Sequence, residues 1–133
     1  MQIATWPWRT VCGALLIAAA TASGAAGQGA IITPDTKPYD DRLMRLSEIL
    51  GAVHYLRELC GASDGQVWRE RMRELMDAEG STALRRAKLT RSFNSGYRSY
   101  SRTYNSCTPS AQTAITKFLS EGAEIADALK AVP

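Results

Sequence analysis

Apolar residues recur at helical intervals from Asp40 onward, and the first such segment has one continuous apolar face. If successive residues advance by about 100°, seven side chains fall within an arc of about 140°: Leu43, Leu46, Ile49, Leu50, Val53, Leu56 and Cys60. Asp40 and Asp41 stand where an N-cap and a first-turn acid are favoured, and Gly61 is typical of a helix stop. The pattern therefore predicts an amphipathic helix between Asp40 and Gly61.

A second, shorter segment has its own start and stop signals. Ser63 and Gln66 have the spacing of a capping box, and Gly80 favours the end of a helix. The apolar side chains between them share one face: Trp68, Met72, Leu75 and Met76. Because its neighbours on this face are apolar, we expect Trp68 to belong to the core, with a sugar-binding platform as the alternative.

The third segment starts at Ser81 or Thr82 and is predicted to continue to about Cys107. A row of mostly aromatic side chains gathers within about 80° of its helical projection: Leu89, Phe93, Tyr97, Tyr100, Tyr104 and Cys107. This row is predicted to be the buried face of a long helix.

Thr108 and Pro109 mark the start of a fourth helix, because threonine is a favoured N-cap and proline is favoured at the first helical position. Its apolar residues follow one line: Ala111, Ile115, Phe118, Gly122, Ile125 and Leu129. Gly122 in that line permits close approach of another helix. Four amphipathic helices with short connections predict an all-α fold, a small antiparallel helical bundle of about four helices.

The 133-residue chain opens on a segment with the organisation of a secretion signal. Arg9 precedes ten apolar residues, 11–20, and small residues suited to a signal peptidase follow. We expect a cleaved signal peptide over residues 1–25, a flexible leader over 26–39 and a helical domain over 40–133. An uncleaved membrane anchor is the alternative, but a membrane-crossing helix needs about 20 apolar residues. The expected location is the periplasm, with no transmembrane segment after signal removal.

Signal removal takes away Cys12 and leaves Cys60 and Cys107 in a compartment where thiols oxidise. An even pair in a small exported domain predicts a disulfide between Cys60 and Cys107. A redox-active pair is the alternative, although such pairs usually have the spacing C-x-x-C. The predicted disulfide cross-links the bundle by joining the ends of the first and third helices.

Charge is unevenly distributed, although the net formal charge is only +3. Residues 81–120 carry seven bases and no acid, whereas residues 35–80 carry ten acids and seven bases. A basic row lies opposite the aromatic row of the third helix: Lys88, Arg91, Arg98 and Arg102. It is either a solvated face or a docking surface for an anionic protein, glycan or phospholipid surface, because guanidinium groups bind anionic oxygens bidentately. Nucleic acid is not an expected partner, because an exported protein of small net charge seldom meets it.

Few residues of this chain are suited to catalysis. His54 is the only histidine, and no motif supplies a nucleophile, although Glu58 lies one helical turn later. We therefore expect His54 to be a partly buried structural residue, and we expect no enzyme activity, no cofactor and no metal. Arg57 lies near the end of the first helix, where its stem can cover apolar surface or its head can pair with a carboxylate. The carboxylates considered for that pairing are Glu70, Glu74 and Asp77.

Three stretches resemble a known family: residues 39–61 (YDDRLMRLSEILGAVHYLRELCG), 67–80 (VWRERMRELMDAEG) and 85–111 (RRAKLTRSFNSGYRSYSRTYNSCTPSA). They are similar to a family of small exported proteins of alphaproteobacteria that carry a domain of unknown function. The resemblance implies a periplasmic location and no established activity. A shorter similarity, the F-x-x-G-Y pattern from Phe93 to Tyr97, is to small helical periplasmic immunity factors against secreted amidases.

The sequence therefore indicates an exported, periplasmic binding or accessory protein. A structural protein associated with the cell envelope is the first alternative, and a small enzyme using His54 is the second. Salt-sensitive sedimentation with envelope fragments would indicate the structural role. Retention of a discrete soluble protein on an affinity column would indicate the binding role.

Overall fold

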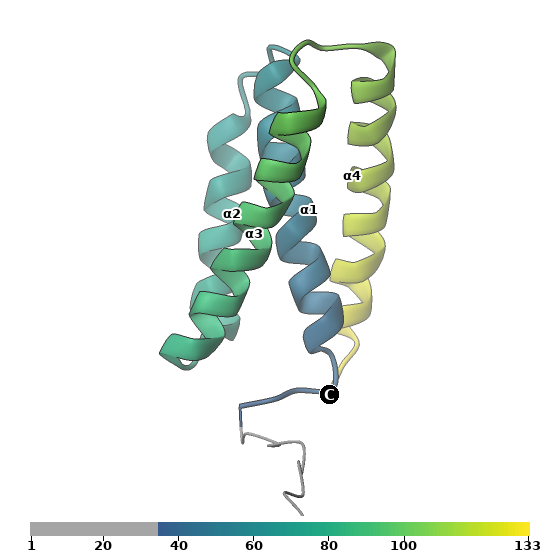
Figure 1. Cartoon of the computed structure of the whole chain (residues 1–133). Coiled ribbons are helices and arrows are strands. Elements are labelled where there is room, and N and C mark those ends of the chain that lie inside the picture. Colours follow the sequence, from purple (N-terminus) through teal and green to yellow (C-terminus); the bar gives the residue numbers. More distant parts are fainter. Residues whose placement is uncertain (1–34) are drawn as a thin grey trace, which may run out of the picture. The chain divides into compact units, whose positions relative to one another are not determined.

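The computed structural model describes residues 35–133, which form four helices and no strand (Figure 1). The helices are α1 (Asp40–Leu59), α2 (Gly65–Glu79), α3 (Ala83–Thr103) and α4 (Pro109–Lys130). Consecutive helices run in opposite directions, as their short connections require. The predicted all-α antiparallel bundle is therefore confirmed. The predicted signal peptide and residues 26–34 of the predicted leader lie outside the described residues.

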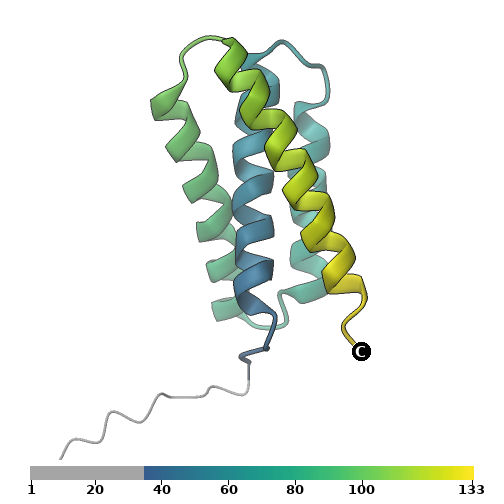
Figure 2. The ribbon, with the colours of Figure 1, turned by 90° about the vertical axis from the view of Figure 1, so that its right-hand side faces the viewer.

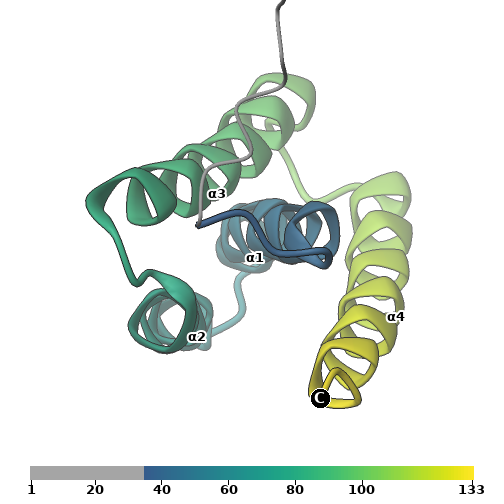
Figure 3. The same cartoon turned by 90° about the horizontal axis from the view of Figure 1, so that it is seen from below.

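Helix α1 is the centre of the bundle and contacts each of the other three helices (Figures 2 and 3). Within residues 35–133, the backbone of α2 also lies close to that of α3, whereas the backbone of α4 lies close only to that of α1. Side chains still join α3 to α4, because the ring of Tyr100 packs edge-on against that of Phe118, with the ring centroids 5.0 Å apart. The other helices consequently cover α1 on several sides, including the apolar face predicted for it. Even the polar Ser47 and His54 of α1 are buried.

The core consists of two clusters that meet on α1. One cluster joins α1 to α4, and its buried members are Ile49, Ala52, Val53, Leu56, Ala111, Ile115 and Phe118. The other joins α1 to α2 and α3, and its buried members are Leu43, Leu50, Met72 and Leu89. Trp68 of α2 packs against both clusters, which confirms its predicted place in the core.

Several predicted helix boundaries are confirmed by the cap geometry. The hydroxyl of Thr82 accepts a hydrogen bond from the N–H of Arg85, and the hydroxyl of Thr108 accepts one from Ala111, both at 3.1 Å. Pro109 begins α4 as predicted. Gly61 follows α1 with a φ of +74°, a left-handed conformation that glycine adopts without steric cost.

Two predicted start signals are wrong. No capping box forms at Ser63 and Gln66, because α2 begins at Gly65 with Asp64 in the N-cap position. The Asp64 carboxylate caps no N–H of α2; it accepts hydrogen bonds from Arg57 instead. At the start of α1 the N-cap is Tyr39, and Asp40 is already the first helical residue.

The predicted end of the third helix is also wrong, because α3 stops at Thr103 and not at Cys107. Tyr104 has extended backbone, and the chain then crosses to the start of α4. Cys107 therefore lies in the loop between α3 and α4, where it is bonded to Cys60. The aromatic side chains of the row are half-buried and not fully buried, because the backbone of α4 does not lie against α3 and the contact between the two helices is made by side chains such as Tyr100 and Phe118.

Candidate functional site

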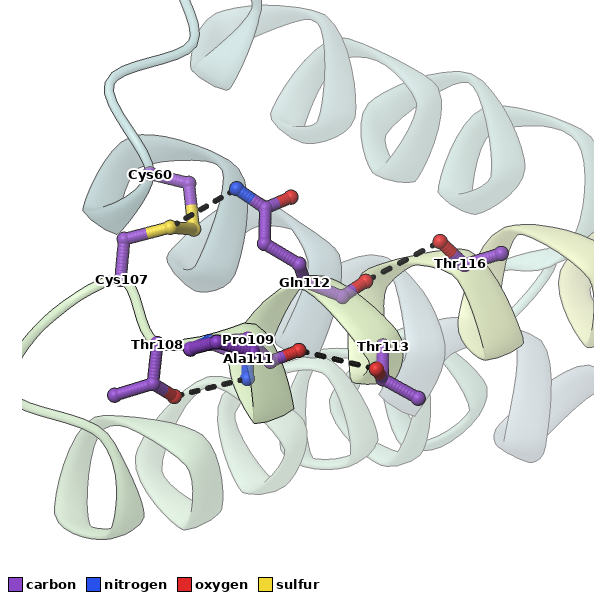
Figure 4. The surroundings of a disulfide bond; sticks show 8 residues. All are labelled: Cys60, Cys107, Thr108, Pro109, Ala111, Gln112, Thr113 and Thr116. Atoms are coloured by element: carbon purple, nitrogen blue, oxygen red, sulfur yellow. Dashed lines mark hydrogen bonds between the residues drawn. A yellow bond between two sulfur atoms is a disulfide. The ribbon is translucent and has the colours of Figure 1, made fainter.

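The predicted disulfide between Cys60 and Cys107 is present (Figure 4). It joins the residue after α1 to the loop before α4, with the two Cα atoms 4.8 Å apart. The side-chain amide of Gln112, in the first turn of α4, lies 3.1 Å from Cys107 Sγ. The disulfide therefore ties the start of α4 to the central helix.

Three of the four residues of the predicted basic row line one shallow surface hollow on α3. Arg91, Arg98 and Arg102 contribute to this hollow, which has a volume of about 650 Å³. The rest of its lining is small or polar: Ala87, Thr90, Asn94, Ser95 and Ser99. We call this surface the α3 basic face. All three arginines are exposed, and the hollow has no carboxylate in its lining.

These three arginines differ from the arginines that join parts of the fold through ion pairs. Within residues 35–133, no carboxylate lies within salt-bridge distance of Arg91, Arg98 or Arg102. By contrast, Arg45 and Arg57 each contact a carboxylate on another part of the fold. The guanidinium groups of the α3 basic face therefore have hydrogen-bonding capacity that no acidic side chain of the described residues uses.

Lys88 lies one turn before Arg91 but does not line the hollow. Its charge acts on Asp35, which is bonded to Ser81 and Thr82 at the start of α3. Hydrogen bonds from Thr82 and Ser81 lower the pKa of Asp35, and the positive charges of Arg85 and Lys88 lower it further. These bonds hold residue 35 of the predicted leader against the start of α3.

His54 is buried inside the bundle, with 6% of its surface exposed. Its Nδ1 is 2.8 Å from the carbonyl oxygen of Gly65, and its ring lies 6.0 Å from Phe93 and 5.7 Å from Tyr97. No hydrogen bond joins it to Glu58 within the described part of the chain. His54 thus links α1 to the start of α2 and lines neither the basic face nor the groove described below.

Two arginines bind carboxylates that sequence spacing did not single out. Arg57 makes a two-pronged contact with Asp64, at 3.1 Å from Nε and 2.8 Å from Nη2, and not with the three carboxylates considered for it. Arg45 binds both carboxylate oxygens of Glu121 on α4, at 2.7 and 3.0 Å. These hydrogen bonds lower the pKa of Asp64 and of Glu121, since they favour the charged carboxylate.

Arg85 is a buried cation that the sequence pattern did not reveal, with 3% of its side chain exposed. Its guanidinium lies 2.7 Å from Asp40 and 3.2 Å from Glu79, and it donates to the backbone carbonyls of Glu79 and Asp35. Burial opposes its charge, but the two carboxylates outweigh burial and raise the pKa of Arg85. The cluster fastens the start of α1 to the α2–α3 turn.

A second hollow, of about 600 Å³, lies between α2 and α4 and was also not predicted. Its floor is the α1 side chains Leu46, Ile49, Leu50 and Val53. Its α2 wall is Trp68, Arg71, Glu74 and Leu75, and its α4 wall is Phe118, Leu119, Gly122, Ala123, Ala126 and Lys130. We call it the α2–α4 groove. Hydrophobic periodicity indicates which helix faces are apolar but not how far apart two helices lie, so the sequence held no direct signal for it.

Two further properties of the described residues concern ligands and membranes. No group of three or more His, Cys, Asp or Glu residues between 35 and 133 is arranged to hold a metal ion. None of the four helices in that range has the length and apolar composition needed to cross a membrane.

The comparisons with known proteins identify a family. A search of curated proteins and a search of solved structures each gave no match. Residues 38–132 match the family described as "Protein of unknown function (DUF2385)", and this range contains all four helices and both cysteines of the disulfide. Since the match spans well over half of the chain, the protein belongs to the DUF2385 family.

Proposed function

We propose that the protein is an exported, periplasmic binding or accessory protein that docks an anionic partner on its α3 basic face. The observation that supports this most directly is the alignment of Arg91, Arg98 and Arg102 along one hollow without a carboxylate partner. A face that only keeps the protein soluble has no need of a hollow or of three unpaired guanidinium groups on one line.

The chemistry of the face fits an anionic ligand that extends along the helix. With a rise of about 1.5 Å per residue, Arg91 and Arg98 are about 10 Å apart along the α3 axis, and Arg98 and Arg102 about 6 Å. Each guanidinium can bind a carboxylate or phosphate through two N–H donors. Thr90, Ser95 and Ser99 add hydroxyl groups between the charges. A partner with repeated anionic groups is therefore favoured over one with a single charge.

The proposed location rests on separate features. The start of the chain has the composition of a signal peptide, and the Cys60–Cys107 disulfide is typical of proteins in oxidising compartments. A structural role at the cell envelope is the alternative, and it would use the same basic face against anionic phospholipid. An enzyme using His54 is the weaker alternative, because its imidazole is buried and bonded to Gly65.

The test replaces Arg91, Arg98 and Arg102 together by Gln. Because each side chain is exposed, the expected change in stability is within about ±0.5 kcal/mol per site, and the helical circular dichroism should be unchanged. A matched control replaces Arg42, Arg69 and Arg73 by Gln, which removes the same charge from other exposed positions.

Binding is measured with three probes: phosphatidylglycerol vesicles, heparin as a soluble polyanion, and crosslinking followed by pull-down from periplasm. The proposal expects capture that weakens as salt rises, is lost in the α3 triple variant and persists in the control. Capture by vesicles alone would favour the structural role at the envelope. Equal loss of capture in both triple variants would show that only net charge matters. Unchanged capture by the α3 triple variant would exclude docking on α3.

A further inference from the structure

The α2–α4 groove is a candidate ligand site separate from the α3 basic face, and its chemistry is different. Its volume of about 600 Å³ lies within the range of small-molecule sites, and most of its lining is apolar. Within residues 35–133 no helix covers it, because α2 and α4 make no contact with each other across α1 (Figure 3). We propose that this groove binds a single-chain amphiphile, an apolar chain with an anionic head group, of which a fatty acid is the simplest example.

The size of the groove bears on what it can hold. Ile49 and Val53 form part of its floor, and only 3% and 0% of their surfaces are exposed. A helix with its side chains is about 10–12 Å across, so a volume of about 600 Å³ holds little more than one helical turn. An extended hydrocarbon chain is much thinner, so the same volume holds a greater length of it. The volume therefore favours an acyl chain over the helix of a partner protein.

The α4 wall provides the space for such a chain. Gly122, Ala123 and Ala126 face the groove where larger residues would fill it, and Leu119 beside them is 38% exposed. A Cβ atom on Gly122 would come within 3.4 Å of Ile49 Cγ2, so this position borders the floor directly. Since the backbones of α2 and α4 do not lie against each other, a chain entering here separates no closely packed pair of helices.

The charges on the walls fit an anionic head group. Each wall carries one cation, Arg71 on α2 and Lys130 on α4. Glu74 is the single acid in the lining, and its ion pair with Arg71 is solvent-exposed, as is the pair of Lys130 with Asp127. Exposed ion pairs contribute little to stability and exchange readily for another anion. A carboxylate at the mouth of the groove can therefore pair with Arg71 on the α2 wall or with Lys130 on the α4 wall.

Trp68 provides a direct reading of binding, because it lines the α2 wall. Bromine atoms on a lipid chain quench tryptophan emission at contact distance. We expect dibromostearate to quench the emission of the full chain, whereas unbrominated stearate does not. The signal of Trp6 and Trp8 is measured in the Trp68→Phe variant and subtracted.

Two substitutions locate the binding site. Ala123→Phe places a ring in the groove from an exposed position, and we expect it to weaken binding by about tenfold or more, equivalent to about 1.4 kcal/mol. Ala78→Phe makes the same change at an exposed position of α2 outside the groove, and binding should be unchanged. The double change Arg71→Gln and Lys130→Gln should weaken binding of the acid but not of its methyl ester.

Three results would overturn the proposal. The first is an absence of quenching by dibromostearate in the wild-type chain. The second is equal quenching in the Ala123→Phe and Ala78→Phe variants, which would indicate nonspecific contact. The third is a dimer in sedimentation that Ala123→Phe converts to a monomer, because a second copy of the chain would then occupy the groove.

Discussion

Gly51 of α1 and Gly96 of α3 form a reciprocal contact at which the two helix backbones touch. A Cβ atom on Gly51 would lie 1.9 Å from the carbonyl oxygen of Phe93, and one on Gly96 would lie 2.0 Å from that of Glu48. Each glycine thus faces a carbonyl of the other helix. A glycine in a helix interior lowers the stability of the helix by about 1 kcal/mol relative to alanine. Here the two glycines permit the close approach of α1 and α3.

We expect Gly51→Ala and Gly96→Ala each to lower the free energy of unfolding by about 1–3 kcal/mol. The added methyl group meets backbone oxygen, which cannot rotate away as a side chain can, so the helices must separate. This outweighs the gain of about 1 kcal/mol in helix propensity. Urea denaturation followed by circular dichroism measures the change.

Gly122→Ala is the matched control for these glycine variants. Its Cβ would meet a side-chain methyl group of Ile49 at 3.4 Å, which can shift. We expect a change within about 1 kcal/mol, of either sign. If all three alanine variants were equally stable, the backbone contact between α1 and α3 would not constrain the fold.

Loss of the disulfide should destabilise the protein strongly. Replacing Cys60 by Ala opens a loop that spans 47 positions of sequence, and we expect unfolding to become easier by about 2–5 kcal/mol. Thiol titration of the denatured, unreduced protein should find no free thiol once Cys12 has been removed with the signal. Two thiols per processed chain would instead indicate a reduced pair, available for metal or redox chemistry.

Arg85→Met should destabilise the fold by about 3 kcal/mol or more, because it removes a buried cation and leaves the Asp40 and Glu79 carboxylates unpaired. The neighbouring Arg86 is the control, since it is exposed and its carboxylate contact, to Asp77, is 3.7 Å long. Arg86→Gln should change stability by less than about 1 kcal/mol. Similar losses for both variants in urea denaturation would contradict the structural role of Arg85.

The Arg45–Glu121 pair should make stability depend on acid pH. Arg45 holds the folded-state pKa of Glu121 below its ordinary value of 4.5, so the pair stabilises the fold above that pH and ceases to do so as pH falls through the lowered value. Because both side chains are about 40% exposed, the contribution is at most about 1 kcal/mol. Glu121→Gln should reduce stability at pH 7 and leave it unchanged in strong acid. A difference from wild type that is the same at every pH would contradict this assignment.

Features that depend on near neighbours in the chain were predictable from the sequence. Thr82 and Thr108 cap the helices that follow them, because a threonine hydroxyl reaches the N–H group three residues later whatever the rest of the fold does. The predicted basic row is exposed on one face of α3, because helical periodicity fixes which residues share a face. The pairing of Cys60 with Cys107 was predictable because they are the two cysteines that remain when the predicted signal peptide, with Cys12, is removed in an oxidising compartment.

Other features were decided only by tertiary structure, because they depend on distances between helices. The partner of Arg57 is Asp64 and none of the three carboxylates considered for it, and α2 begins at Gly65 without the capping box expected at Ser63 and Gln66. The burial of Arg85 required three segments to meet at one point.

The α2–α4 groove and the contact of Gly51 with α3 both result from how the other three helices pack around α1. The backbones of α1 and α3 touch, whereas α2 and α4 stay apart. Apolar periodicity indicates which residues of a helix are apolar neighbours, so it specifies that each helix packs on something but not on which neighbour or how closely. That outcome is set by the volumes of side chains brought together from distant parts of the chain, which only the folded structure defines.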